Sequence, residues 1–76
     1  IEEGEEYLKA KGFEHVRLRV HGKMARIEVH PEDIERLSDP GVRTAVAKKL
    51  RSLGFTYVSI DLEGYRMGSL NEVLGR

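Results

Sequence analysis

Between residues 16 and 29, apolar and polar side chains alternate along the chain, with one break at Gly22-Lys23. The apolar positions are Val16, Leu18, Val20, Ala25, Ile27 and Val29. Such alternation is typical of strands that have one buried face and one solvated face. A Gly-containing pair of residues between two alternating runs is typical of a tight turn. The sequence therefore predicts a β-hairpin with one charged face. That face carries Arg17, Arg19, Arg26 and Glu28.

Helical patterns lie on both sides of this hairpin. Residues 2–11 begin with acids and end with lysines, and Gly12 is a natural stop for the helix. Pro31 and the pair Asp39-Pro40 each mark the start of a further helix. Residues 55–62 then predict a third strand, with Val58 and Ile60 facing the core and Leu62 continuing their pattern. We expect the order α-β-β-α-α-β, a small α+β domain with helices packed on one face of a three-stranded sheet.

The sequence also contains a weak internal similarity. Gly12-Phe13 and Gly54-Phe55 each lie between a predicted helix and a predicted strand. This similarity fits an ancient duplication. It fits equally a common way of connecting a helix to a strand.

Composition limits the classes of protein to consider. The chain of 76 residues makes one domain, residues 1–76, and it contains no cysteine. Its 13 basic and 13 acidic residues balance, so we expect no nucleic acid among its partners. No run is long and apolar enough for a membrane span, and no signal peptide is visible, so we expect a cytoplasmic protein. Because the chain starts at Ile1 with a helical pattern, we expect an excised domain of a larger protein.

The charged face is the main candidate for a functional site in this sequence. Arg17 and Arg19 point the same way, about 6.5–7 Å apart along a strand, and could grip one phosphate or carboxylate. Glu28 could orient a guanidinium or bind a hard divalent cation. The alternative is a solvated face whose cross-strand ion pairs need no ligand. A third strand in the same sheet would add three side chains to this face. These are Tyr57, Ser59 and Asp61.

Other residue types offer less. His15, His21 and His30 could share the charged face, but we interpret them as solvated or helix-capping residues rather than metal ligands. The sequence has no Walker-type phosphate loop and no supported Ser-His-Asp arrangement. The segment 61–72 is a polar loop in which Gly64 and Gly68 meet strict backbone demands, and Ser69 with Glu72 forms a capping box. Loops that follow a strand in this way often carry function.

Three segments together resemble a known family. They are Arg17-Leu18-Arg19, residues 25–33 (Ala-Arg-Ile-Glu-Val-His-Pro-Glu-Asp) and residues 61–72 (Asp-Leu-Glu-Gly-Tyr-Arg-Met-Gly-Ser-Leu-Asn-Glu). They resemble the C-terminal domain of the ATP-dependent sacrificial sulfur transferases, PP-loop enzymes of the lactate racemase nickel-pincer cofactor pathway. The resemblance spans roughly residues 5–74. It implies an N-terminal PP-loop domain in the same chain, which adenylates a substrate carboxylate with ATP and Mg before sulfur is transferred, in many members from a cysteine.

The resemblance also assigns roles to residues. It implies that Arg17 and Arg19 bind the phosphate of a mononucleotide substrate, and that Glu28 contacts metal or substrate at an oligomer interface. It gives no role to five residues of the last loop, which we expect to hold the loop or to form an oligomer contact. They are Asp61, Glu63, Tyr65, Arg66 and Asn71. Since the chain has neither the ATP loop nor a cysteine, we expect it to have no cofactor and no catalytic activity of its own. The resemblance also implies that its parent is a homo-oligomer.

Two alternatives stay open. The same order of elements matches one KH-type RNA-binding arrangement, which needs a Gly-x-x-Gly loop between two helices. Residues 38–41 (Ser-Asp-Pro-Gly) offer only one of the two glycines. The other alternative is a purely structural oligomerisation domain without a ligand.

Overall fold

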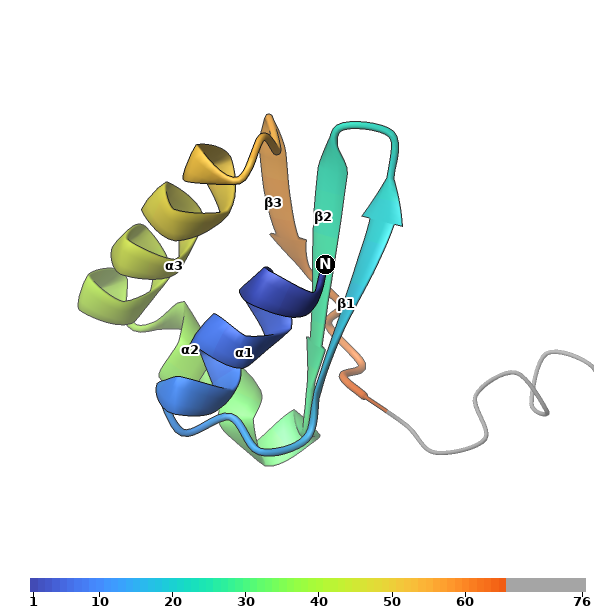
Figure 1. Ribbon diagram of the computed structural model, residues 1–76. Helices are drawn as coiled ribbons and strands as arrows, with labels where there is room; N and C mark the ends of the chain where they lie inside the picture. Colours follow the sequence, from blue (N-terminus) through green and yellow to red (C-terminus); the bar gives the residue numbers. More distant parts are fainter. Residues whose placement is uncertain (66–76) are drawn as a thin grey trace, which may run out of the picture.

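A computed structural model describes residues 1–65 and contains the expected order of elements (Figure 1). The helices are α1 (Glu2–Ala10), α2 (Ile34–Ser38) and α3 (Pro40–Ser52), with a 3₁₀ turn, η1 (Pro31–Asp33), before α2. The strands are β1 (Val16–His21), β2 (Met24–Val29) and β3 (Tyr57–Ile60). The predicted α-β-β-α-α-β domain with its three-stranded sheet is confirmed.

The sheet is mixed, and β2 is its central strand. The strand order is β1-β2-β3, with β1 antiparallel and β3 parallel to β2. The hairpin between β1 and β2 closes at Gly22, whose φ of 59° suits the first central position of a two-residue turn. In this register Arg17 lies opposite Glu28, and Arg19 lies opposite Arg26. The turn therefore places all four charged residues on one face.

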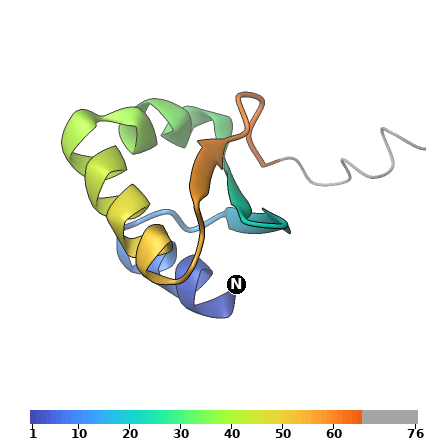
Figure 2. The ribbon, with the colours of Figure 1, turned by 90° about the horizontal axis from the view of Figure 1, so that it is seen from above.

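The helices lie on the other face of the sheet (Figure 2). The core between the two layers consists of aliphatic side chains and one phenylalanine. Its buried members are Leu8, Phe13, Val16, Leu18, Ala25, Ile27, Val29, Leu37, Val46 and Leu50. Buried Gly4 lets α1 approach closely, because a Cβ there would lie 2.8 Å from Leu18 Cδ2. Five of the six inward positions predicted for the hairpin thus belong to the core. The sixth, Val20, is 37% exposed near the hairpin turn, so its predicted burial is wrong.

The two Gly-Phe pairs end their helices in the same way. Gly12 has a φ of 102°, and the N–H of Phe13 donates to Leu8 O at 3.1 Å. Gly54 has a φ of 109°, and the N–H of Phe55 donates to Leu50 O at 3.3 Å. Both are Schellman turns, in which a glycine with positive φ lets the chain satisfy the last helical carbonyls. The shared capping chemistry accounts for the similarity between the two Gly-Phe pairs without a duplication.

The third strand is shorter than predicted. It covers Tyr57–Ile60 rather than residues 55–62, and Val58 and Ile60 are half-buried. The N–H of Asp61 still donates to Ile27 O at 2.9 Å, but the chain then turns, with the N–H of Gly64 donating to Asp61 O. Leu62 falls in this turn and is 85% exposed, so its predicted place on the apolar side of the strand is wrong.

A single residue, Asp39, connects α2 to α3. It ends the first helix, and its carboxylate accepts hydrogen bonds from the N–H groups of Gly41 and Val42, which cap the second. The structure therefore has no multi-residue loop at this point. Within residues 1–65, no helix is both long and apolar enough to cross a lipid bilayer.

The two longer helices have opposite charges. Helix α1 contains four glutamates and one lysine, whereas α3 contains four basic residues and no acid. They meet at Lys49, whose Nζ lies 3.5 Å from Glu3 Oε2 and 5.8 Å from the centre of the Tyr7 ring. Attraction between the helices thus adds to their apolar contacts with the sheet.

Candidate functional site

Polar side chains of all three strands and of the turn after β3 form a layer on the side of the sheet away from the helices. We call this layer the polar sheet face. It consists of Arg17, Arg19, Arg26, Glu28, Ser59, Asp61 and Tyr65. Because side chains alternate along a strand, the register that buries Val16, Leu18 and Ile27 sends their neighbours to this face.

Glu28 lies at the centre of the polar sheet face. It is only 8% exposed, the one charged residue among the buried side chains of the described chain. Its Oε1 lies 3.5 Å from Arg19 Nε, and its Oε2 accepts a hydrogen bond from Arg26 Nη2 at 3.2 Å. A buried carboxylate needs such charged partners, since burial alone would disfavour its ionised form. Glu28 thus orients two guanidiniums, those of Arg19 and Arg26, where the sequence suggested one.

Arg17 is held differently. It lies opposite Glu28 in the strand register, yet its Nη2 donates to the hydroxyl oxygen of Tyr65 at 2.9 Å. Its guanidinium carbon also lies 5.0 Å from the centre of the Tyr65 ring, within cation–π range. Within residues 1–65, no carboxylate forms an ion pair with Arg17. Its positive charge is therefore not neutralised by the described chain.

The turn after β3 borders the polar sheet face on its β3 side. Asp61 Oδ2 lies 3.9 Å from Arg26 Nε, too far for a hydrogen bond, while Asp61 Oδ1 accepts from the N–H of Glu63 at 2.9 Å. The Nε of Arg26 is buried without a hydrogen-bond partner among the described residues. Ser59 is occupied by the backbone, since its hydroxyl donates to Ala25 O. Asp61 therefore orders the turn and adds a weak electrostatic contact to Arg26.

Tyr65 reaches Arg17 because the backbone before it docks against β2. The N–H of Tyr65 donates to Val29 O at 2.6 Å, and Gly64 is buried with a φ of 81°. A Cβ on Gly64 would lie 2.5 Å from Val29 O and 3.2 Å from Pro31 Cγ. Only glycine suits such a close approach with positive φ. We call residues 61–65 the docked turn.

The structure brings together most of the predicted site. Arg17, Arg19 and Glu28 share one face, Asp61 and Tyr65 join them, and Glu63 lies exposed in the docked turn. Arg66 and Asn71 lie outside the described residues, as do the predicted Gly68 and the capping box at Ser69. The sequence named Tyr65 without a role, and its contact with Arg17 was missed. The sequence signal for this contact was a glycine followed by an aromatic residue after a strand.

Three predicted polar residues do not join the site. Tyr57 is 67% exposed, and His15 and His21 are exposed as well. His30 caps η1, where its Nδ1 accepts from the N–H of Glu32 at 3.2 Å, as predicted. Among residues 1–65 there is no group of three or more potential ligands that could hold a metal ion. A metal contact at Glu28 stays a prediction.

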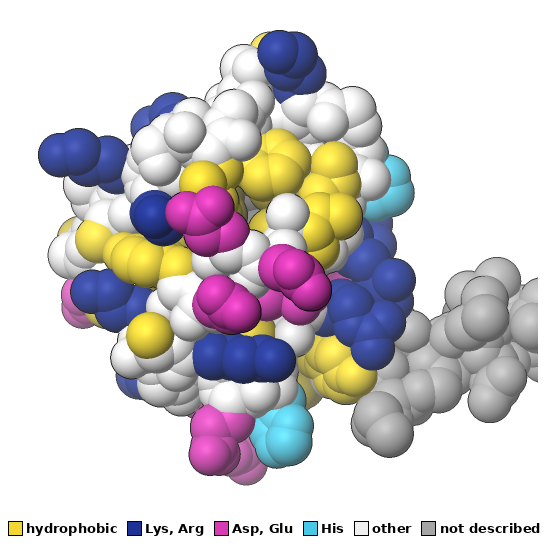
Figure 3. Space-filling model, viewed as in Figure 1, with side chains coloured by type: hydrophobic (Ala, Val, Ile, Leu, Met, Phe, Trp, Pro, Cys, Tyr) yellow, Lys and Arg dark blue, Asp and Glu magenta, His cyan; other side chains and the backbone are white. Residues whose placement is uncertain are grey.

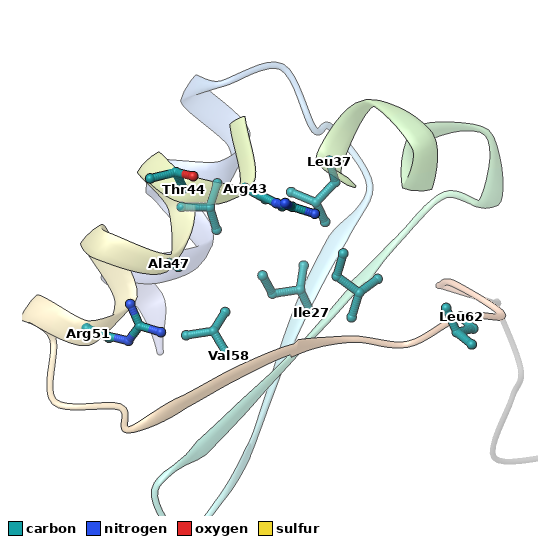
Figure 4. A pocket seen from close by; sticks show the side chains of 10 residues that line it. Ile27, Leu37, Arg43, Thr44, Ala47, Arg51, Val58 and Leu62 are labelled. Atoms are coloured by element: carbon teal, nitrogen blue, oxygen red, sulfur yellow. The ribbon is translucent and has the colours of Figure 1, made fainter. Parts of the chain in front are cut away.

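A second feature is a groove of about 570 Å³ between α3 and β3 (Figure 4). Its walls are mostly aliphatic, with basic side chains of α3 beside them. The lining residues are Ile27, Leu37, Arg43, Thr44, Val46, Ala47, Arg51, Val58, Ile60 and Leu62. On the side of the molecule seen in Figure 1, apolar surface remains visible between the helices and the strands (Figure 3). The helices thus cover the sheet incompletely along β3.

The fold and the polar sheet face define a small α+β domain that carries an arginine-rich surface around one buried carboxylate. No family model matches the chain. It is 46% identical over 71 residues to the pyridinium-3,5-bisthiocarboxylic acid mononucleotide synthase of Lactiplantibacillus plantarum, a match that covers 92% of this chain and 25% of that protein. It is 40% identical over 68 residues to an uncharacterized protein of Synechocystis sp., with 90% and 25% covered. The chain is thus related to a thiocarboxylate synthase and spans about a quarter of the length of both relatives.

Proposed function

We propose that this chain is the substrate-phosphate-binding and oligomerisation domain of an ATP-dependent sulfur transferase. Its parent would convert carboxylates of a pyridinium mononucleotide to thiocarboxylates. The observation that carries this proposal is the 46% identity to the Lactiplantibacillus plantarum synthase over 92% of the chain. The C-terminal position of the domain in the parent, as the sequence motifs imply, is part of the same proposal.

The polar sheet face supports the phosphate-binding part. A mononucleotide carries a phosphate, and guanidiniums bind phosphate through forked, charge-assisted hydrogen bonds. Three arginines and two carboxylates leave the face with one positive charge in excess. The chain contains no cysteine and no phosphate-cradling glycine loop. ATP, Mg and the sulfur chemistry therefore belong to the rest of the parent, and the purified chain should release no pyrophosphate from ATP.

The groove between α3 and β3 supports the second part. Val58 and Ile60 are half-buried there, and Leu62 is 85% exposed. Contiguous exposed apolar surface marks places where proteins associate. We propose that the groove is covered by the N-terminal PP-loop domain or by another subunit. Sedimentation of the parent with Leu62→Lys should show a smaller assembly or a more expanded monomer, whereas Thr56→Lys, at an exposed position just before β3, should change neither.

A purely structural domain is the second candidate, favoured by the mutual pairing of Glu28, Arg19 and Arg26. A titration of the ¹⁵N-labelled chain separates the two. Nicotinate mononucleotide should shift the amide signals of Arg17, Arg19 and Glu28, whereas nicotinate riboside, which lacks the phosphate, should not. Equal shifts with both ligands would refute recognition of the phosphate, and no shift with either would leave the structural role. No observation favours RNA binding, because Asp39 alone separates α2 from α3.

A further inference from the structure

The two arginines of the predicted phosphate pair differ in electrostatic surroundings. Arg19 lies beside the buried carboxylate of Glu28, at 3.5 Å from Nε to Oε1. Arg26 lies between Glu28 and Asp61. Arg17 has no carboxylate partner within residues 1–65, although Glu28 is its neighbour across the strands. Of the three arginines that the structure describes on the polar sheet face, Arg17 is therefore the one whose charge no carboxylate offsets.

A neutral group fixes the Arg17 side chain. The hydroxyl oxygen of Tyr65 accepts from Nη2 at 2.9 Å, and the ring lies 5.0 Å from the guanidinium carbon. This contact restricts the rotamers of a long side chain without cancelling its charge. It engages one nitrogen of the guanidinium, which leaves further N–H groups to donate to a ligand. Binding a ligand to such a restrained side chain costs less conformational entropy than binding it to a free one.

Tyr65 is itself restrained by the backbone. Its N–H donates to Val29 O at 2.6 Å, and buried Gly64 permits that approach. The backbone at Tyr65 is thus held against β2, the central strand of the sheet. The chain that follows β3 therefore links the β3 side of the polar sheet face to Arg17 on β1, through Tyr65.

From these contacts we infer that Arg17 provides the dominant anion contact of the polar sheet face and that Tyr65 is its positioning residue. The inference rests on the proposed phosphate-binding function and narrows it. Arg19, whose charge Glu28 offsets, contributes little affinity and serves mainly to hold Glu28. The ligand that fits is a phosphate monoester, whose three terminal oxygens can accept from the remaining donors of one guanidinium.

The first measurement is the Kd for inorganic phosphate and for nicotinate mononucleotide, followed by NMR on the 76-residue chain. Arg17→Ala should weaken binding roughly 10- to 100-fold, in line with loss of a charge-assisted contact. Arg19→Ala should weaken it less than about 3-fold, since Arg19 is already paired. Tyr65→Phe, which removes only the hydroxyl, should weaken it about 3- to 10-fold. Tyr57→Phe, at an exposed tyrosine of β3, is the matched control and should leave the Kd unchanged.

The second measurement is independent of ligand. The Nε–Hε signal of Arg17 should show restricted fast motion in the wild type and in Tyr57→Phe, and should become mobile in Tyr65→Phe at an unchanged denaturation midpoint. An unchanged Nε–Hε signal in Tyr65→Phe would overturn the positioning role. Equal losses in Arg17→Ala and Arg19→Ala would overturn the dominance of Arg17. A wild-type chain that binds neither phosphate compound would refute the proposed function and Arg17 as its anion contact, while the Nε–Hε signal would still decide the role of Tyr65.

Discussion

Arg19 and Arg26 lie directly opposite each other across β1 and β2, and the buried carboxylate of Glu28 contacts both of them. Like charges at opposed positions of a strand pair are destabilising. One acid, displaced by two residues along β2, offsets both guanidiniums. The stability of the hairpin therefore depends on an interaction on its solvent side as well as on its core.

Glu28→Gln should lower the free energy of unfolding by about 1.5–3 kcal/mol, because the amide offers no charge to the two opposed arginines. The arginine side chains are 40% and 35% exposed, so solvent offsets part of the loss. Urea denaturation measures the change. Glu35→Gln, at an exposed acid of α2, is the control. Equal midpoints for the two variants would show that Glu28 is not needed to offset the arginines.

Gly64→Ala should detach the docked turn. The added Cβ would meet Val29 O at 2.5 Å, and the φ of 81° costs an alanine about 1–2 kcal/mol. Gly22→Ala is the matched control, since Gly22 also has positive φ but no atom within 4 Å of the added Cβ. Hydrogen exchange at the Tyr65 amide should accelerate in Gly64→Ala only. Protection at Tyr65 that survives this substitution would contradict the close approach described above.

Arg36→Ala should destabilise the end of α1. The Arg36 guanidinium lies 4.2 Å from the centre of the Phe13 ring and donates to Gly12 O at 3.0 Å. Loss of both contacts should cost about 1–2 kcal/mol, seen as a lower Tm. Arg36→Lys should recover only part of this, because an ammonium lacks the planar fork. Arg43→Ala, at an exposed arginine of α3, should change the Tm little.

Ile60→Ser should cost about 1–2 kcal/mol, since Ile60 is half-buried against the core. Leu62→Ser should change the stability of the isolated chain by less than about 0.5 kcal/mol, because Leu62 is 85% exposed. Chemical denaturation at low protein concentration compares them. A large loss with Leu62→Ser would mean that the strand continues past Ile60, as the sequence pattern predicts.

The sequence alone was sufficient for the order of the elements and for the charged face, because a period of two residues determines which side chains share a side of a strand. It could not predict that Glu28 contacts Arg19 and Arg26 rather than Arg17, since all three lie within reach of the same carboxylate. The contact between Arg17 and Tyr65 joins residues 48 positions apart. It depends on β3 lying parallel to β2 and on the turn at Asp61, and neither follows from local residue preferences.

Although the chain has no net charge, two of its packed helices carry opposite charges. Acidic α1 and basic α3 lie side by side, joined at Lys49 and Glu3. The layer of helices therefore carries separated charges of both signs even where the total charge of the chain vanishes. At low ionic strength such a separation of charge favours one orientation of an approaching charged partner. Salt near physiological concentration shortens the range of that orientation to roughly 8 Å.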